Sequence, residues 1–260
     1  MSSLADYYRK YMPIRLRWAI GKFRMGHTDR TNYERIMRGE FDEVAPGECA
    51  YLRSIGRTEA IPYAWTEEYV EDDIEVYKDV QKGMPYVSVG ENKLYFPARY
   101  PKSYVRKYYN TIQIEQDPRS PHYYFDPKEP QLQGCTFLDV GAAEGYVSLL
   151  MAPVAKELIL FECDPDWIKA LQATFEPWKD KTTIINKYAG REHTDQMVCV
   201  DEIVTDKEKP VLKLDVEGME QEVLAGAEST LLCSDTRLYV CTYHKQQDEE
   251  QIDKYLRDHG

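Results

Sequence analysis

Short apolar segments alternate with amphipathic segments from residue 135 to the end of the chain, and this pattern constrains the fold most. The apolar segments predict strands at 135–140, 158–162, 183–186, 211–216 and 238–243. The segments between and after them predict helices at 146–154, 166–175, 220–232 and 249–258. Such alternation is typical of βαβ units, in which a mostly parallel sheet carries helices on both faces. Ligands bind such sheets at the carboxyl ends of the strands, so the residues that follow each strand are the candidate site.

The first half of the chain lacks this alternation. Residues 67–79 have helical character, 86–96 predict a β-hairpin around a turn at 90–93, and a helix is expected from about 104 to 116. We therefore predict three parts: a helical extension over 1–84, a hairpin and connector over 85–133, and an α/β domain over 134–260.

A glycine-containing turn follows the first predicted strand, in Phe137-Leu-Asp-Val-Gly-Ala-Ala-Glu-Gly145. Gly141 and Gly145 allow a tight turn and a close approach of the backbone to a ligand. Asp139 stands just before this turn, and the pattern Gly-x-Gly-x-x-Gly of dinucleotide-binding proteins is missing. A carboxylate here would repel a pyrophosphate, whereas it suits a ligand that carries an ammonium group.

A second acid, Glu162, ends the next strand in Phe161-Glu-Cys-Asp-Pro165, 21 residues after Gly141. This spacing lets a carboxylate reach the two hydroxyls of a ribose. Glu162 alone fits any adenosine cofactor. Together with Asp139 it favours S-adenosylmethionine (SAM) over a nicotinamide dinucleotide.

Two further acids and a histidine follow the later strands. Asp215 and Glu217 come after the fourth strand, and His244 comes after the fifth. These groups can orient a substrate hydroxyl or remove its proton. The same three residues have ligand types that suit a divalent metal, which is the less favoured interpretation.

With these motifs, and with Lys213-Leu-Asp-Val-Glu-Gly-Met-Glu220 and Val223-Leu-Ala-Gly-Ala227, the sequence resembles FkbM-type methyltransferases over about residues 134–260. Those proteins have the class I (Rossmann-like) methyltransferase fold, depend on SAM, and mostly O-methylate sugars, glycolipids or polyketide hydroxyls. With the elements expected before residue 134, we predict this fold with an N-terminal helical and hairpin extension. The resemblance also implies a sugar, glycolipid or similar small molecule or glycan as the methyl acceptor.

The resemblance assigns roles to individual positions. Asp215, His244 and Glu217 would lie beside the reacting methyl group. Residues 186–189 would lie along the adenine. The implied cofactor-binding residues are Asp139, Gly141, Ala142, Gly145, Tyr146, Glu162, Cys163, Tyr188 and Asp215.

The sequence also departs from the family pattern. Thr242 replaces an acid that often stands two residues before the histidine, and 187–190 contain no acid to read the adenine. The chain stops where the family usually continues into a final strand pair, so we expect a sheet without that pair. The segment before the first strand commonly covers the cofactor pocket in class I enzymes, which makes Gln116, His122 and Tyr123 candidate lid or substrate residues.

Charge and cysteine content limit the partners. Residues 135–260 carry the entire net charge of −12, which argues against a nucleic acid substrate because its phosphates would be repelled. Residues 1–38 instead carry nine Lys or Arg against three acids, interleaved with aromatic residues. They form either a packed helix, which we favour, or a peripheral membrane contact. Six cysteines without a CxxC pair, and no signal peptide, predict a cytoplasmic protein.

Two other function classes stay open at this point. One is a nicotinamide-dependent oxidoreductase on the same sheet, with which Glu162 is compatible. The other is a non-catalytic module that binds SAM or a glycan. The oligomeric state does not follow from the sequence.

Overall fold

The computed structural model describes residues 30–59, 61–204, 208–233, 235–245 and 247–259, so the predicted basic segment 1–38 lies mostly outside the described residues. The chain divides into two compact units, Met1–Tyr69 and Val70–Gly260. The first unit contains a helix over residues 30–37, α3 (Pro46–Ile55) and the 3-10 helix η1 (Ala64–Glu68). Its buried residues include Ile36, Cys49 and Leu52.

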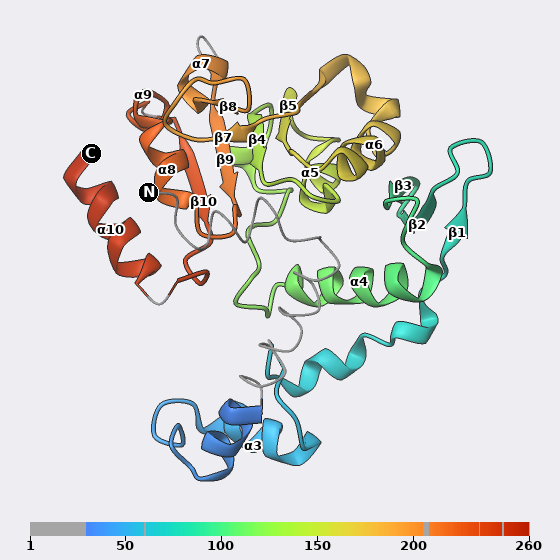
Figure 1. The fold of residues 1–260 in the computed structure, drawn as a ribbon, viewed down its shortest axis with the longest axis vertical. Coiled ribbons are helices and arrows are strands. Elements are labelled where there is room, and N and C mark those ends of the chain that lie inside the picture. The colour runs from blue at the N-terminus through green and yellow to red at the C-terminus, as the bar shows by residue number, and fades with distance from the viewer. Residues whose placement is uncertain (1–29, 60, 205–207, 234, 246, 260) are drawn as a thin grey trace, which may run out of the picture. The chain divides into compact units, whose positions relative to one another are not determined.

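The second unit is built on a five-stranded sheet in which every neighbouring pair is parallel (Figure 1). The strand order is β10-β9-β4-β5-β6. This sheet confirms the predicted α/β fold. The strands are β4 (Thr136–Val140), β5 (Glu157–Phe161), β6 (Thr182–Ile185), β9 (Pro210–Leu214) and β10 (Arg237–Val240).

Alternate residues of these strands enter two separate cores, as the two-residue period of a strand requires. One core contains Phe137, Leu158 and Leu160 and is completed by α4 (Lys102–Glu115), α5 (Tyr146–Met151) and α6 (Pro165–Thr174). The other contains Leu138 and Ile159. It is completed by α7 (Val200–Val204), α8 (Glu220–Ala225) and α10 (Asp248–His259). The sheet is therefore the middle of three layers.

Two small sheets accompany the central one. β1 (Tyr77–Lys78), β2 (Pro85–Val89) and β3 (Asn92–Tyr95) are antiparallel, which confirms the predicted hairpin with a tighter turn at Gly90 and Glu91. β7 (Tyr188–Ala189) pairs with β8 (Met197–Val198). The remaining short elements are η2 (Glu71–Asp73), η3 (Pro130–Leu132), η4 (Glu176–Lys181) and α9 (Glu228–Leu231).

Two helix predictions are wrong. Residues 67–79 form only short 3-10 turns and the strand β1, because the seven acids of this segment would repel one another in a helix. The helix predicted over 220–232 is divided into α8 and α9 at Gly226. A Cβ atom on Gly226 would lie 1.9 Å from the Gly190 carbonyl oxygen, so the chain needs a glycine at this close backbone contact.

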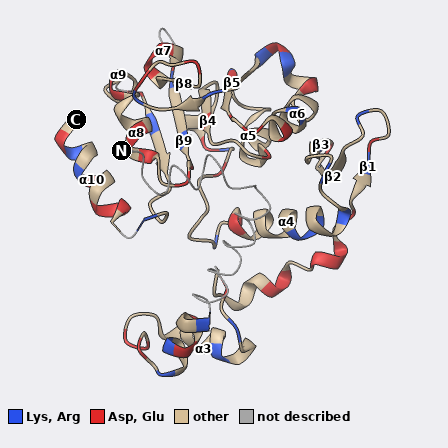
Figure 2. Ribbon diagram, viewed as in Figure 1, with Lys and Arg blue, Asp and Glu red and all other residues tan. Residues whose placement is uncertain are grey.

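Acidic residues occupy the first turn of α10, where their negative charges interact favourably with the positive end of the helix dipole (Figure 2). Within the described part of the chain, no helix has both the length and the apolar character that crossing a membrane requires.

Candidate active site

The candidate site lies where β4 and β9 are neighbours. The chain leaves these adjacent strands in different directions, which makes this the switch point of the sheet. The amide of Asp215 donates to the Val140 carbonyl at 3.1 Å, which ties the two strand ends together. Gly141 has φ +80°, and a Cβ there would lie 2.0 Å from the Asp215 carbonyl oxygen. The first glycine of the turn is thus required by the strand packing itself.

A cavity of about 60 Å³ opens at this point. It joins predicted residues from the connector and from the sheet with residues that the sequence analysis missed. Gln116, His122 and Asp215 belong to the predicted set. Glu115, Tyr124, Glu144 and Lys213 are among those it missed. Ile112, Val147 and Tyr243 complete the lining.

Lys213 is a buried cation beside this cavity. Its Nζ lies 3.0 Å from Asp139 Oδ1 and donates to the Gly141 carbonyl at 3.0 Å. Burial alone would lower the pKa of Lys213, but the negative charges of Asp139 and Asp215 raise it. Asp139 is 1% exposed and also accepts a bond from Ser148 Oγ at 2.6 Å. Asp139 does not line the cavity itself, but it contacts Lys213, which does.

Two carboxyl groups face Lys213 across the cavity. Burial raises the pKa of Glu144 to about 7, and Tyr108 donates a hydrogen bond to its Oε2 at 3.1 Å. Burial, followed by the charges of Glu144 and Asp215, raises the pKa of Glu115 to about 7 as well. The sequence held signals for two of the missed residues: a lysine inside an apolar strand and an acid inside the glycine turn. It held none for Glu115, whose position depends on where α4 packs.

Asp215 is the carboxylate with the most directed contacts in the cavity. The Tyr124 hydroxyl donates to Asp215 Oδ2 at 3.1 Å. On the other oxygen, His244 Nε2 lies 3.3 Å from Oδ1. The second ring nitrogen of His244, Nδ1, lies 2.8 Å from Oε1 of the buried Glu220. His244 contacts Asp215 but does not itself line the cavity.

Glu162 lies at the end of β5, as predicted, and is half-buried. Its Oε2 accepts from the Ala143 amide at 3.0 Å, and its Oε1 accepts from the Cys163 and Asp164 amides at 2.8 and 2.7 Å. These bonds join the glycine turn after β4 to the start of α6. Glu162 therefore links these two loops.

The other predicted cofactor residues surround the same two loops. Ala142 is buried, whereas Tyr146 is half-buried and packs edge-on against Tyr109 with 5.9 Å between ring centres. A Cβ on Gly145 would lie 2.6 Å from Leu171, so this glycine serves the packing of α5 on α6. The half-buried Cys163 follows Glu162, and the exposed Tyr188 lies on β7.

Not all predicted catalytic and lid residues come together. Glu217 is exposed in a left-handed backbone conformation (φ +55°) and does not line the cavity. Tyr123 does not line it either. His122 does, and its ring stacks on Tyr243 with 4.7 Å between centres. Burial lowers the pKa of His122.

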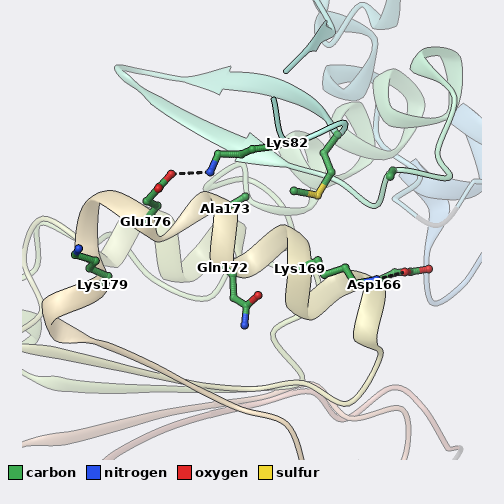
Figure 3. A pocket seen from close by; sticks show the side chains of 9 residues that line it. Lys82, Asp166, Lys169, Gln172, Ala173, Glu176 and Lys179 are labelled. Carbon is green, nitrogen blue, oxygen red and sulfur yellow. Dashed lines mark hydrogen bonds and ion pairs between the residues drawn. The ribbon is translucent and has the colours of Figure 1, made fainter. Parts of the chain in front are cut away.

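A second cavity of about 520 Å³ lies between the hairpin region and α6 (Figure 3). Lys82 and Met84 contribute from the hairpin side, and Asp166, Lys169 and Glu176 from α6 and the residues after it. Two ion pairs join four of its five charged groups: Lys82 with Glu176 at 2.6 Å, and Lys169 with Asp166 at 3.7 Å. None of the predicted site residues lines it.

Parallel strand order, a glycine turn after the first strand and acids at three strand ends define the class I methyltransferase fold. The FkbM methyltransferase domain matches residues 88–260. The chain belongs to this family. A search of curated proteins finds no match.

Several solved structures are similar to this chain. An FkbM methyltransferase from Methylobacillus flagellatus is 19% identical, with a TM-score of 0.45, over 60% of this chain and 46% of that one. A precorrin-6y C5,15-methyltransferase from Geobacter metallireducens is 14% identical, with a TM-score of 0.36, over 49% of this chain and 64% of that one. This chain thus covers less than two thirds of the length of each of these two proteins.

Proposed function

We propose that this chain transfers a methyl group from SAM to a hydroxyl of a sugar, glycolipid or similar acceptor. The observation that carries the proposal is Asp215, a carboxylate held by Tyr124 and His244 in a cavity at the switch point of the sheet. SAM supplies, when bound, an electrophilic methyl group on a sulfonium. Methyl transfer is an in-line displacement, so the protein mainly has to align donor and acceptor.

Residues of the cavity and of the neighbouring strand ends fit this cofactor chemically. Glu162 offers a carboxylate to the ribose hydroxyls at the end of β5, and Tyr188 lies on the strand that follows β6. Glu144 and Glu115 offer carboxyls to an ammonium group, whose positive charge would favour their ionised forms.

Asp215 has the position of a general base. The hydroxyl and the imidazole that contact its two oxygens hold the carboxylate in one orientation. An acceptor hydroxyl in the cavity could donate its proton to Asp215 as the new carbon–oxygen bond forms. His244 is then a positioning residue, because it contacts Asp215 and Glu220 and does not line the cavity.

Calorimetric titration with S-adenosylhomocysteine (SAH) tests the cofactor. We expect micromolar binding to the wild-type protein and to Asp215→Asn, and at least about tenfold weaker binding to Glu162→Gln. Circular dichroism must show that each variant is folded. Asp139→Ala is unsuitable as a probe, since it would leave the buried Lys213 without its carboxylate. Binding of NADH in place of SAH would favour an oxidoreductase and overturn the proposal.

Release of SAH in the presence of a panel of neutral glycans and glycolipids tests the acceptor and the base. We expect Asp215→Asn to lose turnover while it keeps SAH affinity. Normal turnover in this variant would remove Asp215 from the mechanism. SAH binding without turnover on any acceptor would favour a binding module.

A further inference from the structure

Three potential metal ligands lie close together near Asp215, and none of them lines the cavity. Glu220 is the first residue of α8, His244 follows β10, and Asp248 is the first residue of α10. Each offers a ligand atom that lies within 4.8 Å of the other two. Three elements that are separate in the sequence thus bring an imidazole and two carboxylates together.

The cluster is buried and contains two carboxyl groups. Glu220 is 1% exposed and Asp248 is 2% exposed. Among the described residues, His244 pairs with Glu220, and no ion pair reaches Asp248. Two buried carboxylates are costly unless further positive charge compensates them. A divalent cation would supply that charge.

Glu220 has an oxygen available for a ligand. Its Oε1 accepts from the Val216 and Gly218 amides, each at 3.2 Å, which fixes the direction of the side chain. Its Oε2 is buried and has no hydrogen-bond partner. A buried carboxylate oxygen without a partner is uncommon in folded proteins and calls for an explanation such as an ion.

His244 has the surroundings of a metal-binding histidine. A ligand histidine usually donates its other ring N–H to a carboxylate or carbonyl, which fixes the tautomer and the ring orientation. Here Nδ1 faces Glu220 at 2.8 Å, and Nε2 lies 3.3 Å from Asp215 Oδ1. Asp215 can therefore serve as that outer partner if Nδ1 binds a metal.

We propose that Glu220, His244 and Asp248 bind a divalent transition-metal ion, with Zn²⁺ as the occupant. An imidazole with two carboxylates suits zinc, whereas magnesium prefers oxygen ligands alone. This set differs from the predicted trio of Asp215, Glu217 and His244, because Glu217 is exposed and Asp215 is an outer partner. The ion orients His244, and through it Asp215, and does not face the acceptor.

If the three side chains only stabilise the fold, conservative amide substitutions should leave metal binding unchanged. Asp248 accepts from the Lys245 amide at 2.7 Å and so helps to begin α10. Asparagine keeps a side-chain oxygen for this amide but is a much poorer zinc ligand. Asp248→Asn therefore separates the capping role from metal binding. Glu220→Gln likewise keeps an oxygen for the two amides and removes the charge.

The test uses the full chain after chelator treatment and removal of the chelator. Co²⁺ is titrated first and followed by visible absorption, and Zn²⁺ is then measured by competition with a chromophoric chelator. We expect one Zn²⁺ per chain and no sulfur-to-cobalt charge-transfer band. Asp248→Asn and Glu220→Gln should each weaken binding at least about tenfold.

Two control variants address unspecific effects. Asp201→Asn changes another capping aspartate, which accepts from the Ser229 and Thr230 amides at 2.9 and 2.8 Å. His193→Gln removes an exposed histidine that pairs with Glu202 at 2.6 Å and could bind metal at the surface. Both should keep the wild-type zinc affinity within about twofold.

Three outcomes overturn the proposal: no saturable zinc binding by the wild-type chain, unchanged affinity in Asp248→Asn, or a loss confined to His193→Gln. SAH titration of the same samples keeps this test separate from the proposed function. SAH binding without zinc binding would reject the metal site and leave the methyltransferase proposal intact.

Discussion

Tyr124 shows how one hydroxyl can fix the orientation of the proposed base. Its O–H donates to Asp215 Oδ2 at 3.1 Å, and His244 contacts the other carboxylate oxygen. We expect Tyr124→Phe to lower turnover about tenfold with SAH affinity unchanged, because the carboxylate is then held from one side only. Turnover equal to that of the wild type would separate Tyr124 from the base.

The raised pKa of Glu144 predicts how the stability of the protein depends on pH. Its carboxyl has a pKa near 7 in the folded protein against an ordinary value of 4.5. Between these values the folded state holds a proton that the unfolded state has released, so stability falls as the pH rises from about 4.5 to 7. Glu144→Gln removes this loss.

We expect Glu144→Gln to raise the free energy of unfolding by about 1–2 kcal/mol at pH 8 and to leave it unchanged at pH 4.5. Urea denaturation at the two pH values measures the difference. Glu91→Gln, in the exposed hairpin turn, is the matched control and should show no such pH dependence. Equal curves for Glu144→Gln and the wild type at pH 8 would contradict the assignment.

Single residues differ in how far the sequence determines them. Asp139 lies near the end of β4 and Asp215 directly follows β9, and both strands have a plain apolar pattern, so the place of these two residues at one edge of the sheet could be predicted. Glu217 could not be placed, because three residues after β9 the alternation no longer holds and the backbone is left-handed. Glu115 and Glu220 enter the site through helix packing, which no local pattern encodes.

At the scale of elements, a close backbone contact at Gly226 separates α8 from α9. Gly226→Ala would place a Cβ 1.9 Å from the Gly190 carbonyl oxygen, and two backbone segments must move to accept it. We expect a loss of stability of about 2–4 kcal/mol, measured as a lower thermal midpoint. Gly47→Ala, where the space around the new Cβ is open, should be neutral or slightly stabilising.

Elements with strong local patterns were predicted well, and those that depend on packing were not. The sheet strands and the hairpin carry apolar or alternating runs bounded by turn residues. Residues 220–232 also have a good helical pattern, yet the helix is broken because the loop at Gly190 packs against it. A contact with a loop 36 positions away has no signature in the 220–232 segment itself.

The whole molecule consists of two units, and we expect the second to work alone. The sheet, both of its cores and every residue proposed for SAM and metal binding belong to Val70–Gly260. A chain that begins at Val70 should therefore fold and bind SAH with an affinity within about twofold of the full chain. A loss of more than tenfold would show that the first unit supports the site.

The same shortened chain tests the basic N-terminal segment. Residues 1–38 carry a net charge of +6, and near an anionic membrane each basic residue contributes about 1 kcal/mol of attraction. If the segment binds membranes, the full chain should sediment with vesicles that contain phosphatidylserine, and the chain from Val70 should stay in the supernatant. Binding should weaken in 0.5 M salt, where surface charges are screened over a few ångströms. If both chains stay in the supernatant, residues 1–38 do not bind membranes, and the packed helix is favoured.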